Sequence, residues 1–78
     1  MLEQEARKQI ETSDDFRQLA GDGFYSVLGE CVDTGNSCFS FMVYVLPQGI
    51  SLQEATVEDK SDSVLWDINE YASGIRMQ

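Results

Sequence analysis

The chain has 78 residues, of which 42% are hydrophobic and 10% aromatic, and it carries 14 acidic against 5 basic residues and no histidine. This length accommodates one small domain, and the apolar content is too high for a disordered acidic tail. The net charge of −9 excludes direct binding of a nucleic-acid backbone or an anionic membrane surface, and it favours basic partners.

The first fifth of the chain has helical periodicity. Its apolar residues recur at near-helical spacing, at Leu2, Ala6, Ile10, Phe16, Leu19 and Ala20. Residues 12–15 predict a break, after which Ser13 caps a second helical segment. Gly21 would end that segment, because glycine adopts the left-handed conformation common at helix C-termini. The charged N-terminus lacks the apolar core of a secretory signal, so we expect a cytoplasmic protein.

Residues 24–32 and 38–46 predict a β-hairpin, because they are rich in Phe, Tyr and Val and enclose the turn residues 33–37. A two-residue loop at Gly35 and Asn36 would place Asp33 opposite Cys38. The core face then collects Phe24, Leu28, Val32, Phe39, Phe41, Val43 and Val45. The second face collects Tyr25, Val27, Cys31, Met42, Tyr44 and Leu46. That face is too apolar to lie entirely in water, so we expect something to cover part of it.

The segment after the hairpin has two interpretations. Ile50 and Leu52 alternate like a third short strand, whereas Ser51 and Glu54 fit a capping box that opens a helix through about Lys60. We favour the helix. A final helix beginning at residues 61–63 has an apolar stripe of Val64, Leu65, Ile68, Tyr71, Ala72 and Ile75.

These elements predict an α+β fold with an N-terminal helix, an antiparallel hairpin and a C-terminal helix packed on the sheet. In that packing, Phe39, Phe41, Val43 and Val45 of the hairpin would contact Trp66, Ile68 and Tyr71 of the helix. The domain would span residues 1–78. Its longest apolar run, residues 41–46, is far short of the roughly 20 residues of a membrane helix.

The sequence gives catalysis little support. Residues 32–35 resemble the aspartic proteases, whose catalytic triplet is D-T-G, and the resemblance implies that Asp33 would act with a second carboxylate in a dimer. Asp, Gly and Asn are also the usual residues of a hairpin turn, and we favour that interpretation. The absence of histidine removes the commonest general base. We therefore expect no enzyme, no catalytic residue and no cofactor.

No metal or redox site is expected either. Cys31 and Cys38 stand seven residues apart, and in the predicted register they lie diagonally on one face, about 7–8 Å apart, which is marginal for a disulfide. We expect free, partly buried thiols. Two cysteines without histidine do not complete a zinc site, and the acidic residues lack the spacing of a calcium loop.

The acidic surface is the remaining functional feature. No lysine or arginine occurs between Arg17 and Lys60. We predict a partner-binding surface that consists of Glu54, Glu58, Asp59, Asp62, Asp67, Glu70, Tyr25 and Tyr44. Such a surface could imitate nucleic acid and occupy the basic groove of a nucleic-acid-binding protein.

The predicted function is therefore a small acidic protein-binding inhibitor of the anti-CRISPR or anti-restriction type. The alternative is an interaction module without mimicry, such as an antitoxin, immunity protein or adaptor, that binds through the exposed hairpin face. A purely solubilising acidic face is a third interpretation. The small core is also compatible with a homodimer.

Overall fold

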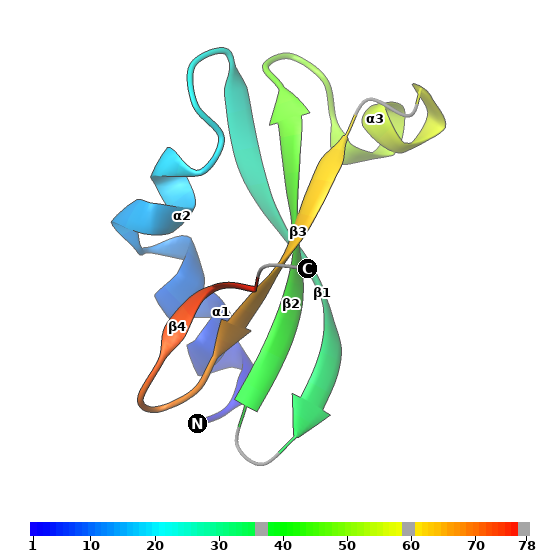
Figure 1. Ribbon diagram of the computed structural model, residues 1–78. Helices are drawn as coiled ribbons and strands as arrows, with labels where there is room; N and C mark the ends of the chain where they lie inside the picture. Colours follow the sequence, from blue (N-terminus) through cyan, green and yellow to red (C-terminus); the bar gives the residue numbers. More distant parts are fainter. Residues whose placement is uncertain (36–37, 59–60, 77–78) are drawn as a thin grey trace.

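A computed structural model describes residues 1–35, 38–58 and 61–76, and within them three helices accompany a four-stranded antiparallel sheet (Figure 1). The elements in chain order are α1 (Glu3–Glu11), α2 (Asp14–Gln18), β1 (Phe24–Gly35), β2 (Cys38–Pro47), α3 (Leu52–Glu58), β3 (Asp62–Ile68) and β4 (Ser73–Arg76). The strands lie in the order β1-β2-β3-β4, so each pairs with its neighbour in the chain. The predicted α+β class is confirmed.

The two N-terminal helices are separated where the sequence predicts a break. The backbone N–H of Phe16 donates to Oγ of Ser13 at 3.2 Å, which caps α2, and the Ser13 hydroxyl donates to the Ile10 carbonyl at 2.9 Å. Gly21 and Gly23 follow the second helix with φ angles of 73° and 82°, a region that glycine adopts without strain. The predicted Ser13 cap is confirmed, but α2 already ends at Gln18 with Leu19 as its C-cap, so Gly21 lies beyond the helix and does not end it as predicted.

The main core lies between α1, α2 and one face of the sheet. Phe41 of β2 and Trp66 of β3 are cross-strand partners, and both are buried there. The Phe16 ring meets Trp66 edge-on, with ring centroids 6.2 Å apart. The complete set of buried residues in this cluster is Ala6, Ile10, Phe16, Phe41, Val43, Trp66 and Ile68.

The β1–β2 hairpin keeps the predicted register only at the end away from its turn. Leu28 pairs with Val43, as the predicted loop requires, but Cys31 pairs with Phe41. The pairing shifts between Leu28 and Cys31, and again between Cys31 and Asp33. Each shift is a β-bulge or a similar irregularity of β1, and such features change which face a side chain occupies.

At the tip, the predicted loop is wrong. Gly35 pairs with Cys38, so it belongs to β1 and not to a two-residue loop. Asp33 pairs with Ser40 and not with Cys38. The other predicted loop residue, Asn36, lies outside the described residues.

The shifts also correct the predicted core. Cys31 faces the helices and packs against the main core, whereas Val32 is 48% exposed. Phe24, also predicted as core, is 46% exposed. Strand alternation places Cys38 on the face opposite to Phe39, which packs on the core. The two cysteines are therefore on opposite faces of the sheet, and the prediction of a diagonal pair on one face is wrong.

The second face of the sheet is covered at one end by α3. The backbone N–H of Glu54 donates to Oγ of Ser51 at 3.2 Å, which confirms the predicted helix cap and the helical interpretation of this segment. Ala55 of α3 and Leu46 of β2 are both fully buried. Figure 1 shows α3 beside the end of β2 and the start of β3, away from α1 and α2. The expectation that part of this face is covered is thus confirmed.

The predicted C-terminal helix is wrong, because β3 and β4 form a hairpin in its place. Residues 64, 66 and 68 of β3 alternate toward the core, and the turn that follows is fixed by a side chain. Oδ1 of Asn69 accepts hydrogen bonds from the backbone N–H groups of Tyr71 and Ala72 at 2.7 and 2.8 Å. The N–H of Asn69 donates to the Ala72 carbonyl at 2.8 Å and closes the turn.

The expected helix-on-sheet contacts change accordingly. Phe39 and Phe41 do adjoin Ile68 and Trp66, but as cross-strand partners within one sheet. Tyr71, which the helical stripe placed in the core, lies in the turn and is 93% exposed.

Candidate partner-binding face

Part of the second sheet face is not covered by α3, and we call it the open face. It carries four half-buried apolar or aromatic side chains, Val27, Met42, Tyr44 and Leu65. Val27 is the cross-strand partner of Tyr44, and Met42 is the partner of Leu65. Their strand positions alternate with the core residues, so these four side chains lie on the side away from α1 and α2.

Tyr44 lies across the irregular part of β1. Its hydroxyl donates to the carboxylate of Glu30, at 3.1 Å from Oε1 and 3.3 Å from Oε2. Its ring covers Gly29, where an added Cβ would stand 2.5 Å from Cε2 of Tyr44 and 3.2 Å from the Met42 carbonyl oxygen. Only glycine leaves room for the ring in this position.

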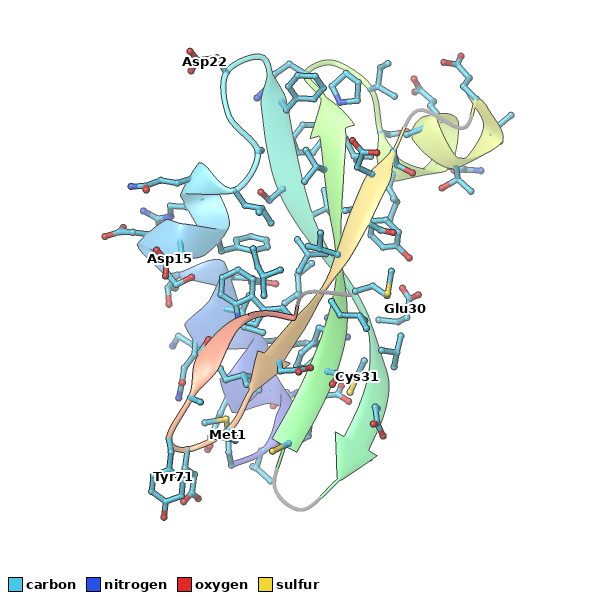
Figure 2. The ribbon with its side chains drawn as sticks, viewed as in Figure 1. Met1, Asp15, Asp22, Glu30, Cys31 and Tyr71 are labelled. Carbon is cyan, nitrogen blue, oxygen red and sulfur yellow. The ribbon has the colours of Figure 1, made fainter. Side chains whose placement is uncertain are left out.

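The hydroxyl of Tyr44 is held in its protonated form. Partial burial raises the pKa of Tyr44 above its usual value, and the hydrogen bond to Glu30 and the charge of that carboxylate raise it further. Figure 2 shows Glu30 on β1, on the side of the sheet away from α1 and α2. Tyr44 and Glu30 therefore combine an aromatic surface with an acidic group on the open face.

The same part of β1 is held from the core side by Arg7 of α1. The Arg7 guanidinium donates to the Gly29 carbonyl at 2.9 Å and stands 5.0 Å from the centroid of the Phe41 ring. Nε of Arg7 also lies 3.6 Å from the Glu3 carboxylate. One helix thus fixes the strand backbone from behind, while Tyr44 packs on it from the front.

Three residues that were not predicted from the sequence, Glu30, Gly29 and Arg7, also build this face. A glycine inside a strand is a known sign of a bulge, so Gly29 carried a usable signal. Glu30 and Arg7 carried none, because their contacts depend on the bulge and on how α1 crosses the sheet.

The two predicted tyrosines have different positions. The hydroxyl of Tyr25 donates to the carbonyl of Ile50, in the loop between β2 and α3. Tyr25 therefore holds the chain that leads into α3, whereas Tyr44 lies on the open face.

Three of the predicted acidic residues gather at the α3 end of the sheet. Glu54 and Glu58 are one helical turn apart on α3, and Asp62 begins β3; all three are exposed. Asp59, also predicted for this surface, lies outside the described residues.

The other two predicted acidic residues lie toward the far end of β3. Asp67 lies on the same side of β3 as Leu65, and Oδ1 accepts a hydrogen bond from Oγ of Ser40 at 2.5 Å. Glu70 is in the β3–β4 turn, with its carboxylate 3.8 Å from the amino group of Met1. The predicted acidic residues therefore form two separate groups and not one continuous surface.

Basic residues of the described helices lie elsewhere. Arg7, Lys8 and Arg17 belong to α1 and α2, on the other side of the sheet (Figure 1). The carboxylates on the side of the open face are Glu30 on β1 and Asp67 on β3, whereas Asp62 alternates with Val64 and Trp66 toward the core side of the sheet. Arg76 of β4 is the cross-strand partner of Leu65, so the described border of the open face combines two carboxylates with one basic residue.

In the part of the chain that the structure describes, no helix is long and apolar enough to cross a membrane. The same residues contain no group of three or more His, Cys, Asp or Glu side chains that could hold a metal ion. Comparison with protein-family models, with curated proteins and with solved structures found no match. The functional assignment therefore depends on the geometry of the chain itself.

Proposed function

We propose that the chain is a protein-binding module, and that its open face binds a basic, partly apolar segment of another protein. The observation that carries the proposal is the combination of four half-buried apolar or aromatic side chains with carboxylates at their border. The four side chains are Val27, Met42, Tyr44 and Leu65. Protein interfaces have this composition, with an apolar centre rich in tyrosine and methionine and a polar rim.

The apolar centre would supply most of the affinity. Complete burial of a leucine or methionine side chain stabilises by about 1.5–3 kcal/mol, and the larger part of each of these side chains is already buried, so a partner that covers the remainder gains at most about 0.5–1 kcal/mol at each position. The acidic border would act mainly on the association rate and on the choice of partner, since exposed charges steer encounter more than they hold a complex.

Inhibition of a nucleic-acid-binding protein by mimicry is a narrower form of this proposal. The grouping of Glu54, Glu58 and Asp62 at the α3 end supports it, as does the net charge of −9. The division of the acidic residues into two groups favours the broader form, in which the apolar centre dominates. Neither form requires a catalytic residue or a cofactor.

The test uses a displayed library of random peptides, selected on the immobilised chain at low salt. We expect the selected peptides to combine lysine or arginine with large apolar residues. Leu65→Ser should weaken their binding, whereas Leu2→Ser should not, because Leu2 is 68% exposed at the start of α1, away from the open face. Circular dichroism would show that both variants fold.

Two results would contradict the proposal. One is selection of peptides without basic residues, and the other is equal loss of binding in the two serine variants. Competition by a DNA or RNA oligonucleotide for the natural partner, once identified, would distinguish mimicry from the broader interaction module.

A further inference from the structure

A second candidate surface lies at the opposite edge of the sheet from β1. In the strand order β1-β2-β3-β4, the last strand pairs with β3 on one side only, within the described residues. The edge of such a strand presents backbone N–H and C=O groups that can pair with another extended chain. Three of the four residues of β4, namely Ser73, Gly74 and Ile75, are uncharged.

The β1 edge is less suited to strand addition. Its pairing with β2 shifts twice between Leu28 and Asp33, and bulges of this kind twist an edge and disfavour further pairing. The β4 edge has no register shift against β3.

A pocket of about 290 Å³ lies between α2 and β4. It is lined by Asp15, Gln18, Leu19, Trp66, Gly74 and Ile75. This volume is at the lower limit of ligand sites, which measure about 300–1,000 Å³, so it suits one long side chain better than a complete small molecule.

The lining is apolar at the back and acidic at the rim. Trp66 is only 2% exposed, and its indole N–H already donates to Oγ of Ser73 at 2.8 Å, so the indole offers an apolar wall. Ile75, directly opposite Trp66 in the β3–β4 pair, is 41% exposed. Asp15 is an exposed carboxylate of α2, and Figure 2 shows it between that helix and β4.

We infer that this pocket binds the lysine or arginine side chain of an extended peptide that pairs with β4 as an added strand. The aliphatic stem of that side chain packs on Trp66, Leu19 and Ile75, and its cationic end meets the Asp15 carboxylate. The amide oxygen of Gln18 is a second acceptor for its N–H donors. The net charge of −9 favours a basic segment over an acidic one.

A neighbouring pocket supports strand addition over capture of a single side chain. About 310 Å³ in volume, it is lined by Asp67, Asn69, Ala72, Ser73, Gly74 and Ile75. Asp67 and Trp66 are consecutive in β3 and so point to opposite faces. The two pockets share Gly74 and Ile75 and flank β4, which matches the alternation of side chains along an added strand. The pocket beside α2 is on the side of the sheet opposite to the open face, whereas the neighbouring pocket shares Asp67 with the border of the open face.

The test is a titration of the 15N-labelled chain with the peptide acetyl-Val-Thr-Lys-Thr-Val-amide, followed by NMR to about 5 mM peptide, a range that detects very weak binding. We expect shifts of the β4 amides and of the single tryptophan indole N–H. Asp15→Asn should weaken binding about threefold to fivefold, as for an exposed ion pair. Asp22→Asn is the matched control, because it removes the same charge from an exposed loop outside both pockets.

Two further peptides separate the parts of the inference. Glutamate in place of the central lysine should abolish the shifts, and N-methylation of the three central amides, which blocks both edges of the peptide, should do the same if the peptide pairs with β4. The inference is overturned if no shifts occur at β4, if the N-methylated peptide binds equally well, or if Asp15→Asn and Asp22→Asn have the same effect. Binding that remains in Leu65→Ser would show that the peptide does not use the open face.

Discussion

The close approach of Tyr44 to Gly29 makes Gly29→Ala a sharp test of how the open face is built. The added Cβ would stand 2.5 Å from Cε2 and 3.1 Å from Cδ2 of the Tyr44 ring. The ring must therefore move, and its hydroxyl then loses the hydrogen bond to Glu30. Overpacking of this kind destabilises by about 1–3 kcal/mol. Alanine also lowers the conformational entropy of the unfolded chain, which stabilises the folded state by about 0.4–1 kcal/mol. We therefore expect the free energy of unfolding to fall by about 1–2 kcal/mol in total.

Gly35→Ala is the matched control, because nothing lies within 4 Å of a Cβ at Gly35. Urea denaturation followed by tryptophan fluorescence would measure both variants, and the Gly29 variant should lose about 1 M or more in midpoint. In a Tyr44→Ala background the effect of Gly29→Ala should largely disappear. A Gly29→Ala variant as stable as the wild-type chain, or one that destabilises equally without the Tyr44 ring, would show that the Tyr44 ring does not require glycine at this position.

Three further predictions concern the core, the thiols and the acidic border. Phe41→Ala should lose about 3–5 kcal/mol, near the whole stability of so small a domain, and melting within a degree or two of the wild-type chain would show that Phe41 is not core. The double variant Cys31→Ser and Cys38→Ser should bind the selected peptides like the wild-type chain. Mass spectrometry of the wild-type chain without reductant should find Cys31 and Cys38 as free thiols, with no disulfide between them. Because the pKa of Tyr44 is raised in the folded state, stability should fall as pH rises through 10.0. Glu30→Gln should lower the pKa of Tyr44, and an absorbance titration that shows no change would contradict this.

Local signals in the sequence predicted the elements that depend on local chemistry. Ser13 and Ser51 each cap a helix because a serine oxygen can accept the backbone N–H three residues later. Tyr44 lies on the second sheet face, as alternation within a strand predicted. Such features need no information about distant parts of the chain.

Each wrong prediction has one of two causes. Either the structure depends on contacts between distant parts of the chain, or the spacing of the apolar residues fits a helix and a strand equally well. Val64 and Ile68 are four residues apart, which fits both a helical stripe and a strand that alternates, so the helix could not be distinguished from β3. The turn at Asn69, which the helical interpretation overlooked, was the available signal against it. The faces of Cys31 and Val32 depend on a bulge whose carbonyl is held by Arg7, from an element more than twenty residues away.

The sequence predicted the type of partner for the candidate site, but not which residues lie together in it. Net charge predicts a basic partner, but the separation of Glu70 from Glu54 and Glu58 follows from the β3–β4 hairpin, which places Glu70 beside the amino group of Met1. The apolar centre of the open face is equally a product of topology, since Leu65 reaches Met42 only as a strand neighbour.

The most direct test of the proposed function is an NMR map of the 15N-labelled chain bound to a selected basic peptide. A protein-binding open face predicts the largest shifts at Val27, Met42, Tyr44 and Leu65, with smaller shifts at the neighbouring acidic residues. It also predicts that the association rate falls as salt screens those carboxylates. Shifts confined to α1, α2 or the exposed loops, with the four residues of the open face unchanged, would contradict the proposal.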